Sequence, residues 1–176
     1  MKISALLLVA IMLCVAASPA QEGSGKPANR DSVIAAAREI MGAQTYCALI
    51  TLDSTGGPQA RTMNPFPPDS TMTVWIATNT RSRKAAQIQH NPRVCLYYAD
   101  HKEAKGYVAI TGKATLVYDN AEKLKRKRAY WDQAFPDWKY LVLIKVVPER
   151  LEVVNYRHGM LNESVTWKAP SIDFGQ

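Results

Sequence analysis

The chain has 176 residues, of which 47% are hydrophobic and 21% are charged, with 10 prolines and 9 glycines. This length predicts one domain, and the composition excludes a wholly disordered chain, a collagen and a coiled coil. The formal net charge of +7 is the one unusual total. It raises nucleic acid, anionic membranes and phosphorylated small molecules as partners, without choosing among them.

The N-terminal residues 1–20 have the layout of a secretory signal peptide. Lys2 precedes an uncharged apolar run over residues 3–17, and the small residues Ser18 and Ala20 suit cleavage after Ala20. The apolar run is short for a membrane span, although an uncleaved anchor is the alternative. We therefore expect an exported protein, periplasmic or secreted, with no stable membrane span after cleavage.

Residues 21–30 are polar and rich in Gly, Lys and Pro, which predicts a flexible lead-in. A short amphipathic helix is expected next. Asp31 or Ser32 is its expected cap, and apolar residues recur at helical spacing as far as Ile40, before Gly42 ends the pattern. The folded domain therefore begins at this helix.

Beyond the helix the hydrophobic period changes to two, which predicts β-strands. The turn at residues 53–57 makes the first two strands a hairpin. Gly112 interrupts the fifth strand, where a bulge would let the sheet curl. Helices are expected over residues 80–89 and 120–133, the second of them strongly basic. The expected strands cover residues 46–52, 59–63, 71–78, 93–99, 107–117, 140–147 and 150–154.

Neither an internal repeat nor a second composition regime divides the chain. We expect one domain over residues 31–156 and a C-terminal tail over residues 157–176. Sequential strands with helices inserted between them predict the α+β class. The specific prediction is six or seven antiparallel strands closed into a small barrel, with short flanking helices.

The cysteines and histidines predict no metal site. Cys47 and Cys95, which remain after the leader, each lie inside an apolar strand-like run, so they are either two buried thiols or a disulfide. The three histidines lie far apart, and no CxxC or HExxH motif is present. Aromatic residues between positions 130 and 140 could cover a bound ring or pack at a subunit interface.

The most informative segment joins the strand over residues 71–78 to the helix after it. A helix N-terminus offers unpaired backbone N–H groups and a partial positive charge, which suit a phosphate. Arg83 and Lys84 would add bidentate and point-charge contacts. A phosphate site and an ordinary capped helix with a basic first turn both fit this pattern. Hydroxyl groups and cations gather at the junction: Thr78, Thr80, Arg81, Ser82, Arg83 and Lys84.

Four segments in one order resemble a known family. Residues 78–96 (TNTRSRKAAQIQHNPRVCL) closely resemble the phosphate-binding helix and following strand of the pyridoxamine 5′-phosphate oxidase-like, FMN-binding split-barrel family. Residues 61–64 (RTMN) resemble its first flavin-contacting strand, residues 106–112 its long strand, and residues 146–152 its last strand. The resemblance covers about residues 33–154 and is nearest to the general stress protein branch.

The resemblance implies a homodimer of split barrels with two FMN molecules at the subunit interface; haem or a deazaflavin is the alternative cofactor. Arg83 and Lys84 would bind the FMN phosphate, helped by Ser82 and Thr78. The isoalloxazine ring and ribityl chain would lie along Arg61, Thr62, Met63 and Asn64. Tyr107 stands where related oxidases have a flavin-contacting glutamine.

Departures from the family pattern argue against pyridoxamine 5′-phosphate as the substrate. Glu152 is not followed by the family's tryptophan, and Arg157 and His158 are adjacent where the oxidases have an Arg-x-His pair. The catalytic residues are unknown. The function expected is a flavin-dependent oxidoreductase acting on a small-molecule substrate or electron donor, or else a non-catalytic flavin-binding stress protein. Nucleic-acid binding through the basic run 123–128 lacks a supporting fold signature and conflicts with export.

Overall fold

The computed structural model describes residues 29–175, so the predicted leader and most of the predicted lead-in lie outside the described residues. Within that range, no helix is long and apolar enough to cross a membrane. The first described element is helix α1 (Arg30–Ala43), which Asn29 caps by accepting a hydrogen bond from the Ser32 N–H. The cap therefore lies two residues before the predicted Asp31, and the helix continues through Gly42.

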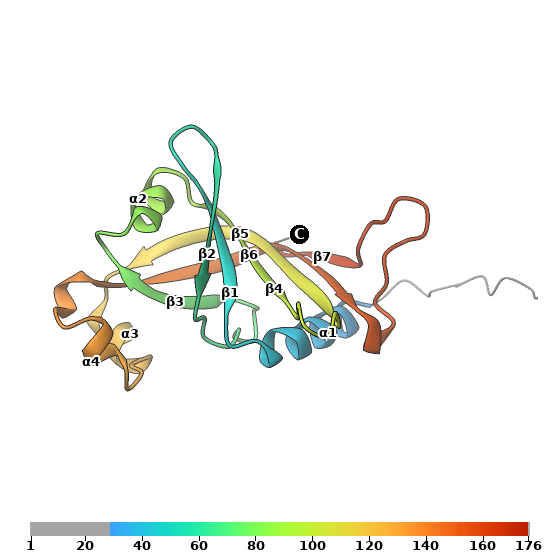
Figure 1. The fold of residues 1–176 in the computed structure, drawn as a ribbon, viewed down its shortest axis with the longest axis horizontal. Helices are drawn as coiled ribbons and strands as arrows, with labels where there is room; N and C mark the ends of the chain where they lie inside the picture. The colour runs from blue at the N-terminus through green and yellow to red at the C-terminus, as the bar shows by residue number, and fades with distance from the viewer. Residues whose placement is uncertain (1–28, 176) are drawn as a thin grey trace, which may run out of the picture.

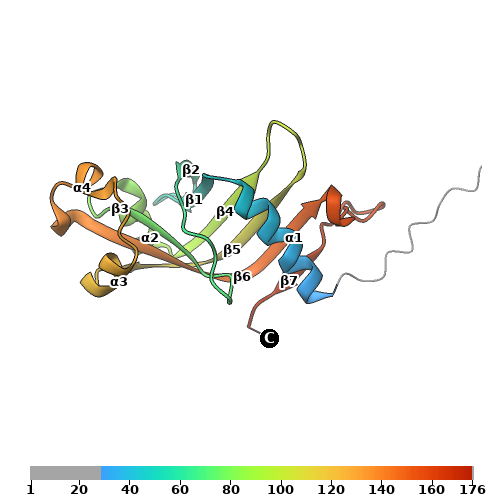
Figure 2. The same cartoon turned by 90° about the horizontal axis from the view of Figure 1, so that it is seen from below.

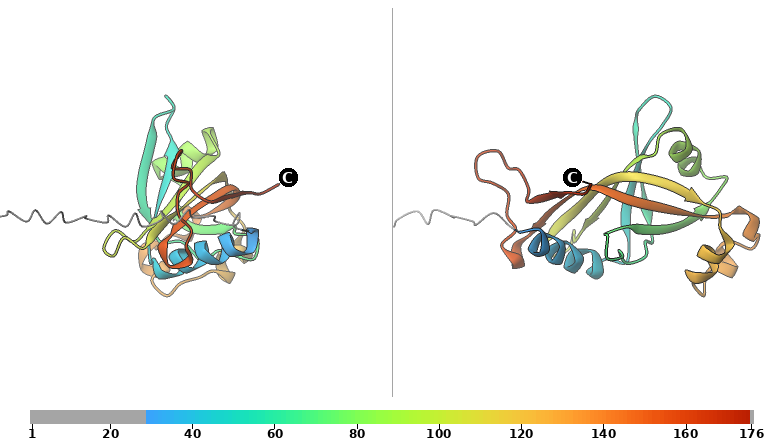
Figure 3. Two further views of the ribbon diagram at one scale, coloured as in Figure 1. Left: turned by 90° about the vertical axis from the view of Figure 1, so that its right-hand side faces the viewer. Right: turned by 180° about the vertical axis from the view of Figure 1, so that it is seen from behind.

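Six strands form one curled antiparallel sheet in the order β2-β1-β4-β5-β6-β3, and β7 pairs with β6 (Figure 1). The edge strands β2 and β3 meet just beyond the end of β2, where Pro65 forms an isolated bridge with Ile76. The views in Figure 3 show the sheet curling on itself. This arrangement confirms the predicted α+β split barrel. The strands are β1 (Cys47–Leu52), β2 (Pro58–Met63), β3 (Val74–Asn79), β4 (Arg93–Ala99), β5 (Gly106–Val117), β6 (Leu141–Asn155) and β7 (Ser171–Asp173).

Helix α1 lies along the sheet, and helix α2 (Arg83–His90) lies farther toward the end of the molecule that carries α3 and α4 (Figures 1 and 2). The apolar stripe of α1 is buried against the sheet, as the periodicity predicts, through Val33, Ala36, Ala37, Ile40 and Met41. The remaining helical elements are α3 (Asn120–Lys125), α4 (Trp131–Ala134) and the 3₁₀ turns η1 (Trp138–Tyr140) and η2 (Tyr156–His158).

The prediction of one helix over residues 120–133 is wrong, because the chain turns between α3 and α4. Two arginines of this turn pack on aromatic rings. The Arg126 guanidinium lies 3.7 Å from the Trp75 ring centroid, and that of Arg128 lies 4.0 Å from the Phe66 ring centroid. A continuous helix with a solvated basic face would not bring these cations onto the rings.

The two strands expected on either side of Pro148 are one continuous strand, β6. Pro148 lies opposite Gly112, where the β5–β6 register shifts. This confirms the predicted irregularity at Gly112. A proline has no N–H to donate, and a bulge is one of the few places in a sheet that tolerates it. Gly112 is required there, because a Cβ would lie 2.1 Å from the Val147 carbonyl oxygen.

Strand β3 begins at Val74, three residues later than predicted. The Asp69 carboxylate accepts hydrogen bonds from the backbone N–H groups of Thr71 and Thr73, and Met72 has a φ of 64°. This aspartate turn occupies residues whose composition alone suits a strand.

The aromatic residues between positions 130 and 140 form much of a second, smaller core. Trp131 is fully buried there with Leu141 and Leu143, and Phe66, Trp75, Phe135 and Trp138 pack around them. The rings of Trp131, Phe135 and Trp138 therefore pack within the chain, whereas Tyr130 is exposed. Cys47 and Cys95 are free thiols, so they form no disulfide.

Candidate functional site

The junction of β3 and α2 brings hydroxyl and ammonium groups together. Ser82 caps α2 by accepting a hydrogen bond from the Ala85 N–H at 3.4 Å. Thr78, which is buried near the end of β3, has its Oγ1 3.5 Å from the Ser82 Oγ. Lys84 Nζ donates to the same Thr78 Oγ1 at 3.2 Å. Arg83 begins the helix and is exposed.

Arg61 reaches the same place from strand β2. Its Nη2 donates to Gln87 Oε1 of α2 at 2.7 Å, and its Nη1 donates to Thr51 Oγ1 of β1. Thr51 Oγ1 in turn donates to Gln87 Oε1 at 2.7 Å. Strands β1 and β2 are thereby joined to the middle of α2.

Burial and mutual repulsion both lower the pKa values of cations in this group. Burial lowers the pKa of Lys84, and the charges of Arg61 and Arg83 lower it further. Burial also lowers the pKa of Arg61, with a further contribution from Arg83. Within residues 29–175, none of the three forms an ion pair with a carboxylate. We call Arg61, Arg83 and Lys84 the cation cluster; its positive charge is uncompensated in the described part of the chain.

The residues after Arg61 follow the alternation expected of a strand. Met63 is buried on the same side as Arg61, whereas Thr62 is exposed on the other side. The Asn64 Oδ1 accepts a hydrogen bond from Arg128 Nη1. Because β2 is an edge strand, one row of its backbone N–H and C=O groups faces away from the sheet.

Tyr107 lies at the end of the β4–β5 ladder that is farther from α2. It pairs with Ala99 at the end of the β4–β5 ladder, whereas Arg93, which follows α2, pairs with Lys113 at the opposite end. Six residues of strand separate the two places, or about 20 Å. Tyr107 is half-buried and stacks on Tyr97, with ring centroids 5.6 Å apart.

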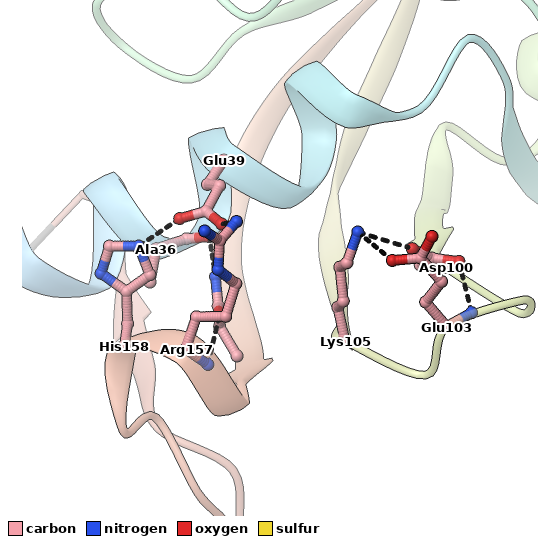
Figure 4. A network of polar contacts seen from close by, with 8 residues as sticks. Ala36, Glu39, Asp100, Glu103, Lys105, Arg157 and His158 are labelled. Atoms are coloured by element: carbon pink, nitrogen blue, oxygen red, sulfur yellow. Dashed lines mark hydrogen bonds and ion pairs between the residues drawn. The ribbon is translucent and has the colours of Figure 1, made fainter.

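The Arg157–His158 pair is engaged with α1 in this chain. Arg157 Nη1 lies 2.9 Å from Glu39 Oε1, and His158 Nε2 hydrogen bonds to Glu39 Oε2 (Figure 4). The hydrogen bond from His158 lowers the pKa of Glu39, and the charge of Arg157 contributes to the same direction. Figure 4 shows Lys105 in a separate contact with Asp100 and Glu103.

Three residues that position the site were missed by the sequence interpretation. Gln87 follows Arg83 by four residues, which places both on one face of α2, so its position could have been anticipated. Thr51 is the last inward-facing residue of β1 and reads as an ordinary strand residue. Arg128 lies within residues 120–133, for which the sequence predicts one continuous helix with a solvated basic face. Within the described residues, no group of three or more Asp, Glu, His and Cys side chains could hold a metal ion.

Comparisons with known proteins agree on the family and the fold. A protein-family model described as pyridoxamine 5′-phosphate oxidase matches residues 33–155. No curated protein matches the chain. A structure from Clostridium acetobutylicum is similar and is described as related to general stress protein 26, of the pyridoxinephosphate oxidase family. It has a TM-score of 0.66 and 17% identity, and the match covers 83% of this chain and 96% of that one.

Other structures with this fold are named for different groups, which are FMN, F420 and heme. A pyridoxamine 5′-phosphate oxidase-related, FMN-binding protein from Nostoc punctiforme has a TM-score of 0.54 and 18% identity, covering 84% of this chain and 97% of its own. An F420 reductase has a TM-score of 0.52 and 22% identity, with coverage of 65% and 94%. A heme-binding protein from Mycobacterium smegmatis has a TM-score of 0.57 and 15% identity, with coverage of 78% and 56%. At these identities the likeness shows the fold alone.

Proposed function

The chain belongs to the pyridoxamine 5′-phosphate oxidase family, and from that premise we propose that it binds FMN, with the FMN phosphate at the start of α2. The observation that carries the proposal is the cation cluster: Arg61, Arg83 and Lys84 lie together without a carboxylate partner in the described chain. Such a cluster is costly to hold together unless an anion binds there.

The residues present fit a phosphate in charge and in hydrogen-bonding capacity. A phosphate dianion has acceptor oxygens for a guanidinium, an ammonium and hydroxyl groups at once. Arg83 and Lys84 supply the cations, and Ser82 and Thr78 supply hydroxyls next to them. The N–H groups of the first turn of α2 add a partial positive charge. Gln87 holds Arg61 in place.

Strand β2 supports the ring position. The ring would lie along the outward backbone row of Arg61, Thr62, Met63 and Asn64, which edge strands leave available. Strands β1 and β4 separate β5, which carries Tyr107, from β2 in the sheet. We therefore propose a homodimer in which Tyr107 of one copy approaches the ring bound by the other.

We propose that the protein is a flavin-dependent oxidoreductase acting on a small molecule. A bound flavin supplies hydride or electron transfer, and the chain has to bind and orient it. An F420 reductase and an FMN-binding protein are among the structures of similar fold, which favours this class. The second candidate is a non-catalytic flavin-binding stress protein. The similarity to a structure described as related to general stress protein 26 favours this candidate.

The absorption spectrum of the purified protein tests the cofactor, because FMN, a deazaflavin and haem absorb differently. The double variant Arg83→Ala, Lys84→Ala is expected to lose the flavin spectrum while remaining folded. Arg81→Ala is the matched control: it removes a cation from the same turn, but that guanidinium lies 3.5 Å from the Tyr140 ring centroid and outside the cluster. A double variant that stays as yellow as the wild type would refute the site.

Catalysis is tested separately by adding NADH or NADPH to flavin-loaded protein under anaerobic conditions and then admitting oxygen as the electron acceptor. Bleaching followed by reoxidation over repeated turnovers supports the oxidoreductase. A bound flavin that no donor reduces supports the binding protein instead. We also propose export, which predicts that the N-terminus of the mature protein purified from its native source is Gln21.

A further inference from the structure

A cavity of about 320 Å³ lies between the C-terminal half of α1 and the segment that follows β2. Figure 3 shows this segment, residues 64–73, passing beside the C-terminal end of α1. The cavity is of the size that small organic ligands occupy. Its walls are mostly apolar, because Met41, Phe66 and three prolines contribute to them.

Two guanidinium groups line the cavity, from Arg38 of α1 and from Arg128 of the turn between α3 and α4. Backbone carbonyl groups hold both in place. Arg38 Nη1 donates to the Pro68 carbonyl at 3.0 Å, and Arg128 Nη2 donates to the Pro65 carbonyl at 2.7 Å. Neither arginine forms an ion pair within residues 29–175, and no acidic residue lines the cavity. Each guanidinium has five N–H donors, so both retain donors for an anion.

Tyr98 lines the cavity from the sheet, and only 1% of its surface is exposed. Its hydroxyl group is buried next to the Cys47 thiol, and burial is the main cause that raises the pKa of Tyr98. Because the hydroxyl oxygen has no accessible surface, a ligand in the cavity would meet the ring of Tyr98 and not its hydroxyl group.

We propose that this cavity binds a small organic anion with a planar apolar body, of which an aromatic carboxylate is the simplest example. The guanidinium groups of Arg38 and Arg128 would contact the carboxylate, which suits their fork of parallel N–H donors. The ring would lie against Phe66 and the prolines.

This site shares only Asn64 with the residues assigned to the flavin, so binding of the anion does not depend on the proposed flavin site. Asn64 ends the stretch along which the flavin ring is placed, and it also lines the cavity. An anion in the cavity would therefore lie next to the ring, in the position of a substrate. That last step rests on the proposed function.

Calorimetric titration of the full chain with 2-naphthoate, and with the uncharged isostere 2-naphthamide, tests the proposal. Naphthoate is expected to bind about tenfold more tightly than the amide, because the amide lacks the charge. Arg38→Gln removes one of the two guanidinium groups that line the cavity, so it is expected to weaken naphthoate binding about tenfold. Arg128→Gln is expected to weaken it about tenfold.

Lys125→Gln is the matched control for Arg128→Gln, because Lys125 is exposed, lies three residues away and does not line the cavity. The control is expected to bind naphthoate as the wild type does. Equal affinity for naphthoate and naphthamide would overturn the proposal, as would unchanged affinity in both the Arg38→Gln and Arg128→Gln variants. The Arg83→Ala, Lys84→Ala protein should still bind naphthoate; loss of binding there would place the anion at the cation cluster and overturn the second site.

Discussion

Replacing Lys84 by Met separates a ligand-binding cation from a structural one, because the two roles predict opposite changes. Lys84 is half-buried beside Arg61 and Arg83, and its amine donates to Thr78 at 3.2 Å. Methionine keeps the unbranched chain and has a similar helix propensity, so the substitution removes mainly the charge. We expect the flavin-free protein to become more stable and FMN binding to become weaker.

The expected magnitudes follow from the contacts. A like-charge pair on neighbouring side chains costs about 0.2–0.5 kcal/mol, so removing two such repulsions stabilises the flavin-free protein by roughly 0.5–1 kcal/mol. In a domain of this size that corresponds to about 1–4 °C in melting temperature. A charge-assisted hydrogen bond to the phosphate contributes about 1.5–3 kcal/mol, so FMN affinity should fall about 10- to 150-fold.

The pH dependence has a definite sign. The folded protein holds Lys84 with a lowered pKa, so the unfolded chain binds the proton more tightly. Below the pKa of Lys84 in the folded protein, its charge destabilises the fold by the full amount. The free energy of unfolding then rises with pH between that lowered pKa and the ordinary value of 10.5. In Lys84→Met this rise should be absent.

Thermal unfolding of flavin-free protein and calorimetric titration with FMN measure the two effects of Lys84→Met. Arg81→Met is the control, since its guanidinium stacks on Tyr140 outside the cation cluster. A variant that is less stable without flavin and binds FMN as tightly as the wild type would refute the reasoning. Lys84 would then be a structural residue.

Three further results are expected. Gly112→Ala should lower the free energy of unfolding by about 1–3 kcal/mol in urea titrations, because the added Cβ would meet the Val147 carbonyl. Gly42→Ala is the control and should not be destabilising, because the space around its added Cβ is open. Cys47, whose pKa burial raises to about 12, should resist alkylation at about pH 8 until the protein unfolds; rapid labelling of Cys47 in the folded protein would contradict the structure. Glu39→Gln should reduce the loss of stability on acidification below pH 4.5, since Glu39 has a lowered pKa in the folded state; an unchanged acid unfolding curve would show that its contact with His158 contributes nothing.

Local patterns in the sequence predict the strands and the start of α2 well, because burial on one face imposes alternation and Ser82 is a common cap. They fail where a distant segment decides the outcome. Pro148 reads as the end of a strand, and only its place opposite Gly112 shows why β6 continues through it. Strand β7 has three residues and pairs with β6 across a long loop, so no local pattern marks it.

The candidate site shows the same division. Ser82, Arg83 and Lys84 are close in sequence, and the helix N-terminus they form is visible in the order of residues. The arrival of Arg61 between Thr51 and Gln87 depends on the curl of the sheet and on where α2 packs. The basic run near residue 126 reads as a solvated helix face, because charge alone does not reveal that Arg126 and Arg128 stack on aromatic rings of other segments.

The central claim is that the cation cluster binds a phosphate that belongs to a flavin. The most direct measurement is the affinity of the flavin-free protein for FMN and for riboflavin, which lacks the phosphate, in the wild type and in the Arg83→Ala, Lys84→Ala variant. The wild type should bind FMN at least about 100-fold more tightly than riboflavin, and the variant should bind both with nearly the affinity that the wild type has for riboflavin. A preference for FMN that survives in the variant, or equal affinities of the wild type for the two flavins, would contradict the account.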